Sequence, residues 1–164
     1  MSDLQTLKSR IIRQLTASRH LAGCDIIEGF SGIRDLLSGP TIAMGLSSVD
    51  LSPAGLGGFS AEQSHHNPGG VAITLSFDLY HPGKDSAPAF ALYESLCTAL
   101  LGLAGQIGLV RIFCDPLRRS EQSSAWHLPA KAELRAALIG EKLPPPGSDS
   151  GGITHFILRS ETNA

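Results

Sequence analysis

The stretch VAITLSFDLYHPGKDS, residues 71–86, constrains the fold more than any other part of the chain. Apolar and polar side chains alternate over its first ten positions, and a period of two is typical of a strand with one buried face. Pro82 and Gly83 then interrupt the alternation. A helix is predicted beyond this break, with Ser86 as its N-cap and Pro88 in its first turn. Its apolar stripe comprises Phe90, Tyr93, Leu96, Cys97, Leu100, Leu101 and Ala104.

The break itself, GKDS at residues 83–86, raises the question of a phosphate-binding loop. Such a loop needs the pattern GxxxxGKS or GxxxxGKT, because backbone amides between the two glycines hold the phosphates. Here the earlier glycine is absent from the required position. Asp85 also stands where an anion would have to bind. The segment is therefore interpreted as a strand-to-helix turn, and no nucleotide is expected.

Composition limits the class of protein further. A chain of 164 residues that is 42% hydrophobic and 17% charged is the size of one globular domain. The formal net charge of −2 gives no cationic excess for a nucleic-acid backbone. No stretch reaches the roughly 18 apolar residues of a membrane span, and the charged first residues lack the apolar core of a signal peptide. We expect neither direct nucleic-acid recognition nor membrane insertion, and a location in the cytoplasm.

Three cysteines, Cys24, Cys97 and Cys114, lie far apart and form no CxxC pair. This pattern favours free thiols over a disulfide framework or a zinc site. His65 and His66 are adjacent, and adjacent side chains of an extended chain diverge. With no third ligand near them in sequence, a solvated loop is the simpler interpretation, and no metal is assigned.

Further elements follow from periodicity and turn residues. Leu4, Leu7, Ile11 and Leu15 predict a short amphipathic helix. Strands are predicted over 24–28, 41–51 and 107–114. Residues 126–138 have the composition of a helix, yet apolar and polar residues alternate strictly, so we predict a strand. Pro129 would then need a place where no ladder donor is required, which favours an edge of the sheet.

Long irregular segments separate these elements. Residues 52–70 are rich in Gly, Ser and Pro, and a loop of this length is unusual inside a compact domain. Arg118 and Arg119 lie in a charged connection, where they either bind an anionic partner or are simply solvated. Residues 140–152 have the composition of a linker. The strand predicted after them, 153–159, could fold back on its own sheet or reach a neighbouring subunit.

Together these elements predict an α+β fold, a mainly antiparallel sheet with two helices packed on one face. Residues 1–139 form one domain, 140–152 a linker and 153–164 a C-terminal extension. Candidate catalytic side chains are Asp78, His81, His127 and His155. Asp78 and His81 flank a strand end and could be an acid/base pair, but a polar strand end has the same composition. No local nucleophile, base and orienting partner occur together, so no catalytic residue or cofactor is assigned.

The order of several segments resembles the tail terminator, or tail completion, proteins of long-tailed bacteriophages and their prophages. The segments are PTIAMGLSSVDL, GLGGF, VAITLSFDLYHPGKD, APAFALYESLCTALLGL, GLVRIFCD and AWHLPAKAELRAALI, within residues 1–139. The resemblance implies an α+β fold, a hexameric ring on the last ring of a tail tube, and no catalytic residues or cofactor. The chain departs from the usual pattern after residue 140, where many relatives end.

The resulting hypothesis is a structural protein that caps the head-proximal end of the tail tube as a ring. Its partners would be copies of itself, the tail tube protein and a neck or head-tail connector. It would lie in the virion tail, and in the host bacterial cytoplasm during assembly. The residues expected to make contacts are Phe59, His65, His66, Arg118, Arg119, Phe156 and Ile157. Alternatives are a neck or head-tail joining protein and a small metal- or nucleotide-dependent hydrolase.

Overall fold

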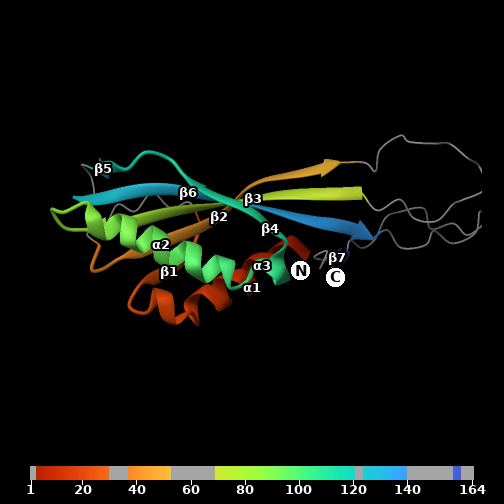
Figure 1. Ribbon diagram of the computed structural model, residues 1–164, viewed down its shortest axis with the longest axis horizontal. Coiled ribbons are helices and arrows are strands. Elements are labelled where there is room, and N and C mark those ends of the chain that lie inside the picture. Colours follow the sequence, from red (N-terminus) through yellow and green to blue (C-terminus); the bar gives the residue numbers. More distant parts are fainter. Residues whose placement is uncertain (1–2, 30–36, 53–68, 121–123, 140–156, 160–164) are drawn as a thin grey trace, which may run out of the picture.

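The computed structural model describes residues 3–29, 37–52, 69–120, 124–139 and 157–159 (Figure 1). Its elements follow one another as α1 (Asp3–Thr16), the 3-10 turn η1 (Arg19–Leu21), β1 (Asp25–Glu28), β2 (Thr41–Ser52), β3 (Gly69–Pro82), α2 (Ala87–Leu101), α3 (Ala104–Ile107), β4 (Leu109–Cys114), β5 (Arg118–Ser120), β6 (Ala125–Ile139) and β7 (Ile157–Arg159).

These strands form one sheet in the order β1-β2-β3-β6-β4, and β5 and β7 also pair with β6. Only the β1–β2 pair is parallel; β2, β3, β4, β5, β6 and β7 pair antiparallel. The described helices lie on one side of the sheet, and β2, β3 and β6 run on past them (Figure 1). The predicted α+β class is thus confirmed, with α3 and η1 added to the two predicted helices.

Alternation in β3 produces the core as predicted. Its apolar set faces the helices and is 0 to 3% exposed: Val71, Ile73, Leu75, Phe77 and Leu79. Partners from β6 continue this layer, because Leu79 pairs with Leu128 and Ile73 pairs with Leu134. Below it pack Ile11 and Leu15 of α1. We call this side the helix face, and the other side of the sheet the open face.

The predicted apolar stripe of α2 is partly wrong. The buried residues of this helix are Ala89, Leu92, Leu96, Ala99 and Leu100, whereas Phe90 and Leu101 are exposed. Two small alanines within the buried set let the helix backbone approach the sheet. The predicted stripe, which includes the larger Phe90 and Leu101, is therefore rotated relative to the side of α2 that is buried. Ser86 holds the N-cap position, but the Asp85 carboxylate accepts the hydrogen bond from the Ala87 amide.

The strand predicted over 107–114 begins two residues late, at Leu109. Residues 104–107 instead form the short helix α3, which Gly108 ends in the left-handed conformation at φ 63°. A Cβ at Gly108 would overlap the Arg135 carbonyl oxygen, since the Gly108 carbonyl accepts from the Arg135 amide. The glycine thus permits both the positive φ and the close approach to β6.

Residues 126–138 do form a strand, β6, but its predicted edge position is wrong. β6 lies between β3 on one side and β4, β5 and β7 on the other. The Pro129 carbonyl accepts from the Asp115 amide, so this side of Pro129 faces the connection between β4 and β5 rather than a strand. The amide and carbonyl of one residue point to the same side of an antiparallel strand. The missing N–H therefore faces a break in the ladder, as the requirement for no donor predicted.

Two further predicted segments have clear positions. Arg118 and Arg119 lie in the short strand β5 rather than in an irregular connection. β7 pairs with the end of β6 in the same chain, Ile139 opposite Ile157. Among the described residues, no helix is long and apolar enough to cross a membrane.

Candidate interaction face

The most distinctive polar cluster lies on the open face, where β3 and β6 pair. Nε2 of His127 lies 2.7 Å from Oδ1 of Asp78, and both side chains are 25% exposed. Tyr80 stacks on the His127 ring, with centroids 4.6 Å apart and planes within 9°. Partial burial, and then the charge of Asp78, raise the pKa of the Tyr80 hydroxyl. The three side chains therefore form one packed, partly buried group.

Strand register explains how these residues meet. Tyr80 pairs directly with His127, and Asp78 pairs with Pro129, so Asp78 and His127 are diagonal neighbours across two strands. Diagonal neighbours on one face remain within reach of long side chains. Alternation alone placed Asp78 on the polar side of its strand, but only the β3–β6 register brings His127 beside it. Sequence reasoning therefore missed this pair.

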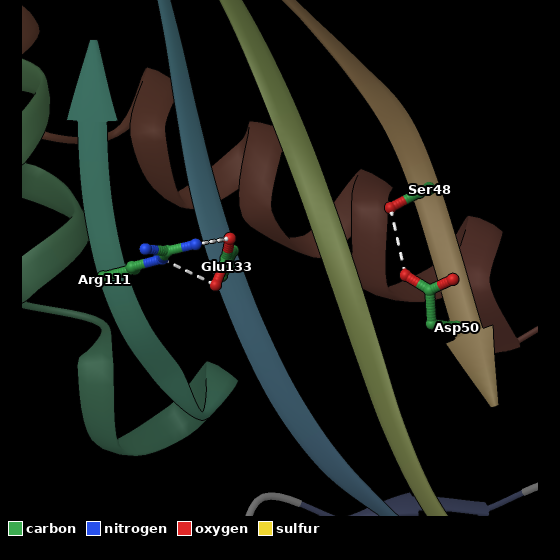
Figure 2. Close-up of polar contacts among 4 residues, drawn as sticks. All are labelled: Ser48, Asp50, Arg111 and Glu133. Carbon is green, nitrogen blue, oxygen red and sulfur yellow. Dashed lines mark hydrogen bonds and ion pairs between the residues drawn. The ribbon is translucent and has the colours of Figure 1, made fainter. Parts of the chain in front are cut away.

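Along the same face, Arg111 of β4 binds Glu133 of β6 with two hydrogen bonds (Figure 2). Nε donates to Oε2 at 2.7 Å and Nη2 donates to Oε1 at 2.5 Å. These bonds lower the pKa of Glu133 and raise that of Arg111. The Arg111 guanidinium also lies 5.0 Å from the ring centre of Phe113. Figure 2 shows Ser48 and Asp50 of β2 on this face, with a helix behind the sheet.

The acid/base pair considered for Asp78 and His81 does not form, in agreement with the interpretation of a polar strand end. The two residues are three apart in one strand, so they lie on opposite faces. His81 instead borders a cavity of about 280 Å³ on the helix side, beside His20 of η1 and Ser95 of α2. Nδ1 of His81 and Nε1 of its cross-strand partner Trp126 are buried without a hydrogen-bond partner among the described residues.

The residues expected to make contacts are only partly described. Phe59, His65, His66 and Phe156, and the candidate His155, lie outside the described residues, and Ile157 begins β7. Arg118 and Arg119 are both exposed but point to opposite faces. Arg118 pairs with His127 of the open face, whereas Arg119 pairs with Trp126 and lies 5.5 Å from its ring centre. They cannot act together on one small anion.

The Asp78–His127 pair of the open face can be compared with the Asp–His part of a catalytic triad. An Asp–His pair is part of the hydrolase triad, but catalysis also needs a nucleophile at the histidine. The Tyr80 ring stacks face to face on the imidazole ring. In this arrangement the Tyr80 hydroxyl is not directed at a ring nitrogen of His127. Within the described ranges, no group of three or more His, Cys, Asp or Glu residues could hold a metal ion. The described residues of the face offer two ion pairs and stacked rings; of these groups, aromatic residues and Arg are enriched at protein interfaces.

Comparison with known proteins gives structural likeness but no match in sequence. No protein-family model matches the chain. None of the curated proteins matches it either.

Among solved structures, the chain is similar to a chain from the virion of a native gene transfer agent particle, with 16% identity and a TM-score of 0.48, covering 77% of this chain and 91% of that one. It is also similar to the sheath/tube terminator, in the extended state, of an extracellular contractile injection system called PVC. That match has 16% identity and a TM-score of 0.40, and covers 99% of this chain and 63% of the other. The printed name of the second structure is that of a sheath/tube terminator.

Proposed function

We propose that this chain is a structural tail protein that caps the head-proximal end of a phage-like tail tube. It assembles there as a ring of identical copies, six by the family resemblance, stops tube polymerisation and offers a surface to the neck or head connector. The resemblance of residues 1–139 to tail terminators supports the class of protein. The residues involved would act by shape and surface charge, without a cofactor.

One observation of the structure carries the proposal: the sheet keeps a long face that no described helix covers (Figure 1). A capping protein must contact its own copies, the tube and the next component, so it needs several separate surfaces. The open face, the helix side and the two sheet edges provide them. The ion pairs on the open face would let it meet a polar partner surface of complementary charge.

Electron microscopy of tails assembled without this protein tests the proposal. Overlong tubes are expected, because nothing would stop the addition of tube subunits. Tails of normal length that lack heads would contradict the capping role and indicate a neck or joining protein instead.

A surface variant sharpens this test. Ala72 is exposed on the open face of β3, opposite Asp50 and Arg135. Ala72→Arg should leave the thermal stability of the purified protein unchanged but fail to restore normal tail length in cells that lack the native gene. Ser9→Arg, on the exposed side of α1, is the matched control and should restore it. Equal rescue by both variants would remove the open face from the proposal.

A further inference from the structure

We infer that copies of this chain join through opposite edges of the sheet, the edge formed by β4 and β5 in one copy meeting the edge formed by β1 in the next. We call these the β4 edge and the β1 edge. The inference rests on the proposed ring and names the surfaces that would build it. Because the two edges differ, the contact is heterologous, and heterologous contacts can close into a ring.

At the β4 edge, no described strand pairs with the outer side of the last strand in the sheet order. β4 pairs with β6 on one side, and Val110, Arg111 and Cys114 are exposed. Its sequence, LVRIFC, carries a single charge. Natural sheets usually protect such edges with lysine, proline or a covering segment, because unpaired backbone groups are open to another strand. Here the bulge between Leu109 and Arg111 disturbs only the beginning of the strand.

Exposed apolar side chains gather beside the same edge. Within the described part of the chain, the large hydrophobic residues that are exposed are Phe90 at 46%, Leu101 at 63% and Val110 at 49%. Phe90 and Leu101 lie on the flank of α2 that carries Cys97, at helical spacings of seven and four residues. This flank lies beside Tyr93, and α2 contacts β4; burial first, then the thiols of Cys97 and of Cys114 in β4, raise the pKa of the Tyr93 hydroxyl. An apolar strip therefore borders the unpaired edge.

The β1 edge carries mainly acidic side chains, whereas the β4 edge carries mainly basic ones. Asp25 and Glu28 of β1 are exposed, and Asp50 is exposed where β2 continues beyond β1. Nζ of Lys8 lies 2.5 Å from Oε1 of Glu28 and forms an ion pair with it. Among the described residues, the Asp25 side chain has no such ion pair or hydrogen bond. The β4 edge carries Arg111, Arg118 and Arg119 against Asp115 and the Glu133 that binds Arg111.

Register places the key charges on one row across the sheet. Asp25 pairs with Thr41, Thr41 with Tyr80, Tyr80 with His127, and His127 with Arg118. Paired residues share a face, so the row ends in a carboxylate at one edge and a guanidinium at the other, both on the open face. If the sheet of one copy continues into the next in the same register, Arg118 of the first meets Asp25 of the second. A partner of another kind would not need ends that complement each other.

A charge swap tests this contact directly. Asp25→Arg and Arg118→Glu each place like charges across every copy-to-copy contact, and each should weaken self-association by about tenfold. The double variant Asp25→Arg/Arg118→Glu restores opposite charges and should return to within about threefold of the native chain. A one-to-one mixture of the two single variants should also assemble, because each supplies the end that the other lacks. Native mass spectrometry should then find both variants in equal number within each oligomer.

Lys84→Glu is the control, since Lys84 is exposed in the turn after the central strand β3 and lies on neither edge. It should associate within about twofold of the native chain, because rim charges remote from a contact change affinity little. Sedimentation velocity measures association, and far-UV circular dichroism checks that each variant is folded. If the native chain remains a monomer alone, the amount of each variant recovered per purified tail is compared instead, with the same order expected.

Native-like assembly by both single variants would overturn the inference. So would loss in both singles with no recovery in the double variant or in the mixture. Failure of the proposed function has a different readout, because normal tube length without the protein would leave these association measurements unaffected.

Discussion

The two faces of β3 carry residues from the same strand, and they differ in almost every physical respect. On the helix face, residues from Val71 to Leu79 at alternate positions are at most 3% exposed and pack against α1 and α2. On the open face, Asp78 retains a quarter of its exposure and pairs with a histidine. One side of the strand therefore contributes stability through burial, whereas the other presents chemical groups while contributing less.

This difference indicates where substitutions can be made without loss of the fold. Burial of large apolar side chains is the main favourable term in folding. Partly exposed ion pairs contribute little, because water competes for both partners. Variants of the open face and of the edges should consequently report on assembly, and variants of the helix face on folding.

Phe77→Ala should have the largest effect and would test the comparison most severely. Phe77 is fully buried on the helix face between Met44 of β2 and Ala130 of β6. Its truncation leaves a cavity and should lower the free energy of unfolding by about 3 to 5 kcal/mol. Denaturation in urea measures the change. Ser76→Ala, one position away on the open face, should cost less than about 1 kcal/mol, since it removes a single 3.4 Å hydrogen bond to the Gly45 carbonyl. Similar losses in both variants would contradict the difference between the faces.

The pair of Asp78 and His127 should have an intermediate effect. Asp78→Asn and His127→Ala should each lower the free energy of unfolding by about 1 to 2 kcal/mol, because each removes a charge-assisted hydrogen bond that is only partly exposed. The double variant should cost less than the sum of the two, with a coupling of about 1 kcal/mol. Strictly additive losses would show that the two side chains do not interact in solution.

Arg111→Gln should have the smallest effect, confined to the titration of one carboxyl group. In the native chain the hydrogen bonds from Arg111 hold the pKa of Glu133 below its ordinary value. A lowered carboxylate pKa stabilises the fold above the unfolded-state pKa, and this contribution is lost as the pH falls through the folded-state pKa. NMR titration of the Glu133 side chain should therefore show its pKa rising in Arg111→Gln. Lys84→Gln should leave it unchanged, and a pKa unaffected by Arg111→Gln would mean that the bidentate pair does not persist in solution.

Local pattern was sufficient for most individual elements of this protein. Alternation identified β3 and β6, even where the composition of β6 favoured a helix, because a period of two belongs to the strand itself. Helical spacing identified α1 and α2 in the same way. It did not identify the buried side of α2, since apolar residues surround that helix and only contact with the sheet selects Ala89 and Ala99 for the interior.

What the sequence determined by itself was therefore a list of elements, a period for each, and a turn rather than a phosphate loop at residues 83–86. Tertiary structure decided which residues meet. It placed β6 inside the sheet with Pro129 at a gap in the ladder, brought His127 beside Asp78, and aligned Asp25 with Arg118 across four strand pairings. The physical reason is that periodicity depends on backbone geometry within one segment, whereas register depends on hydrogen bonds and packing between segments far apart in the chain.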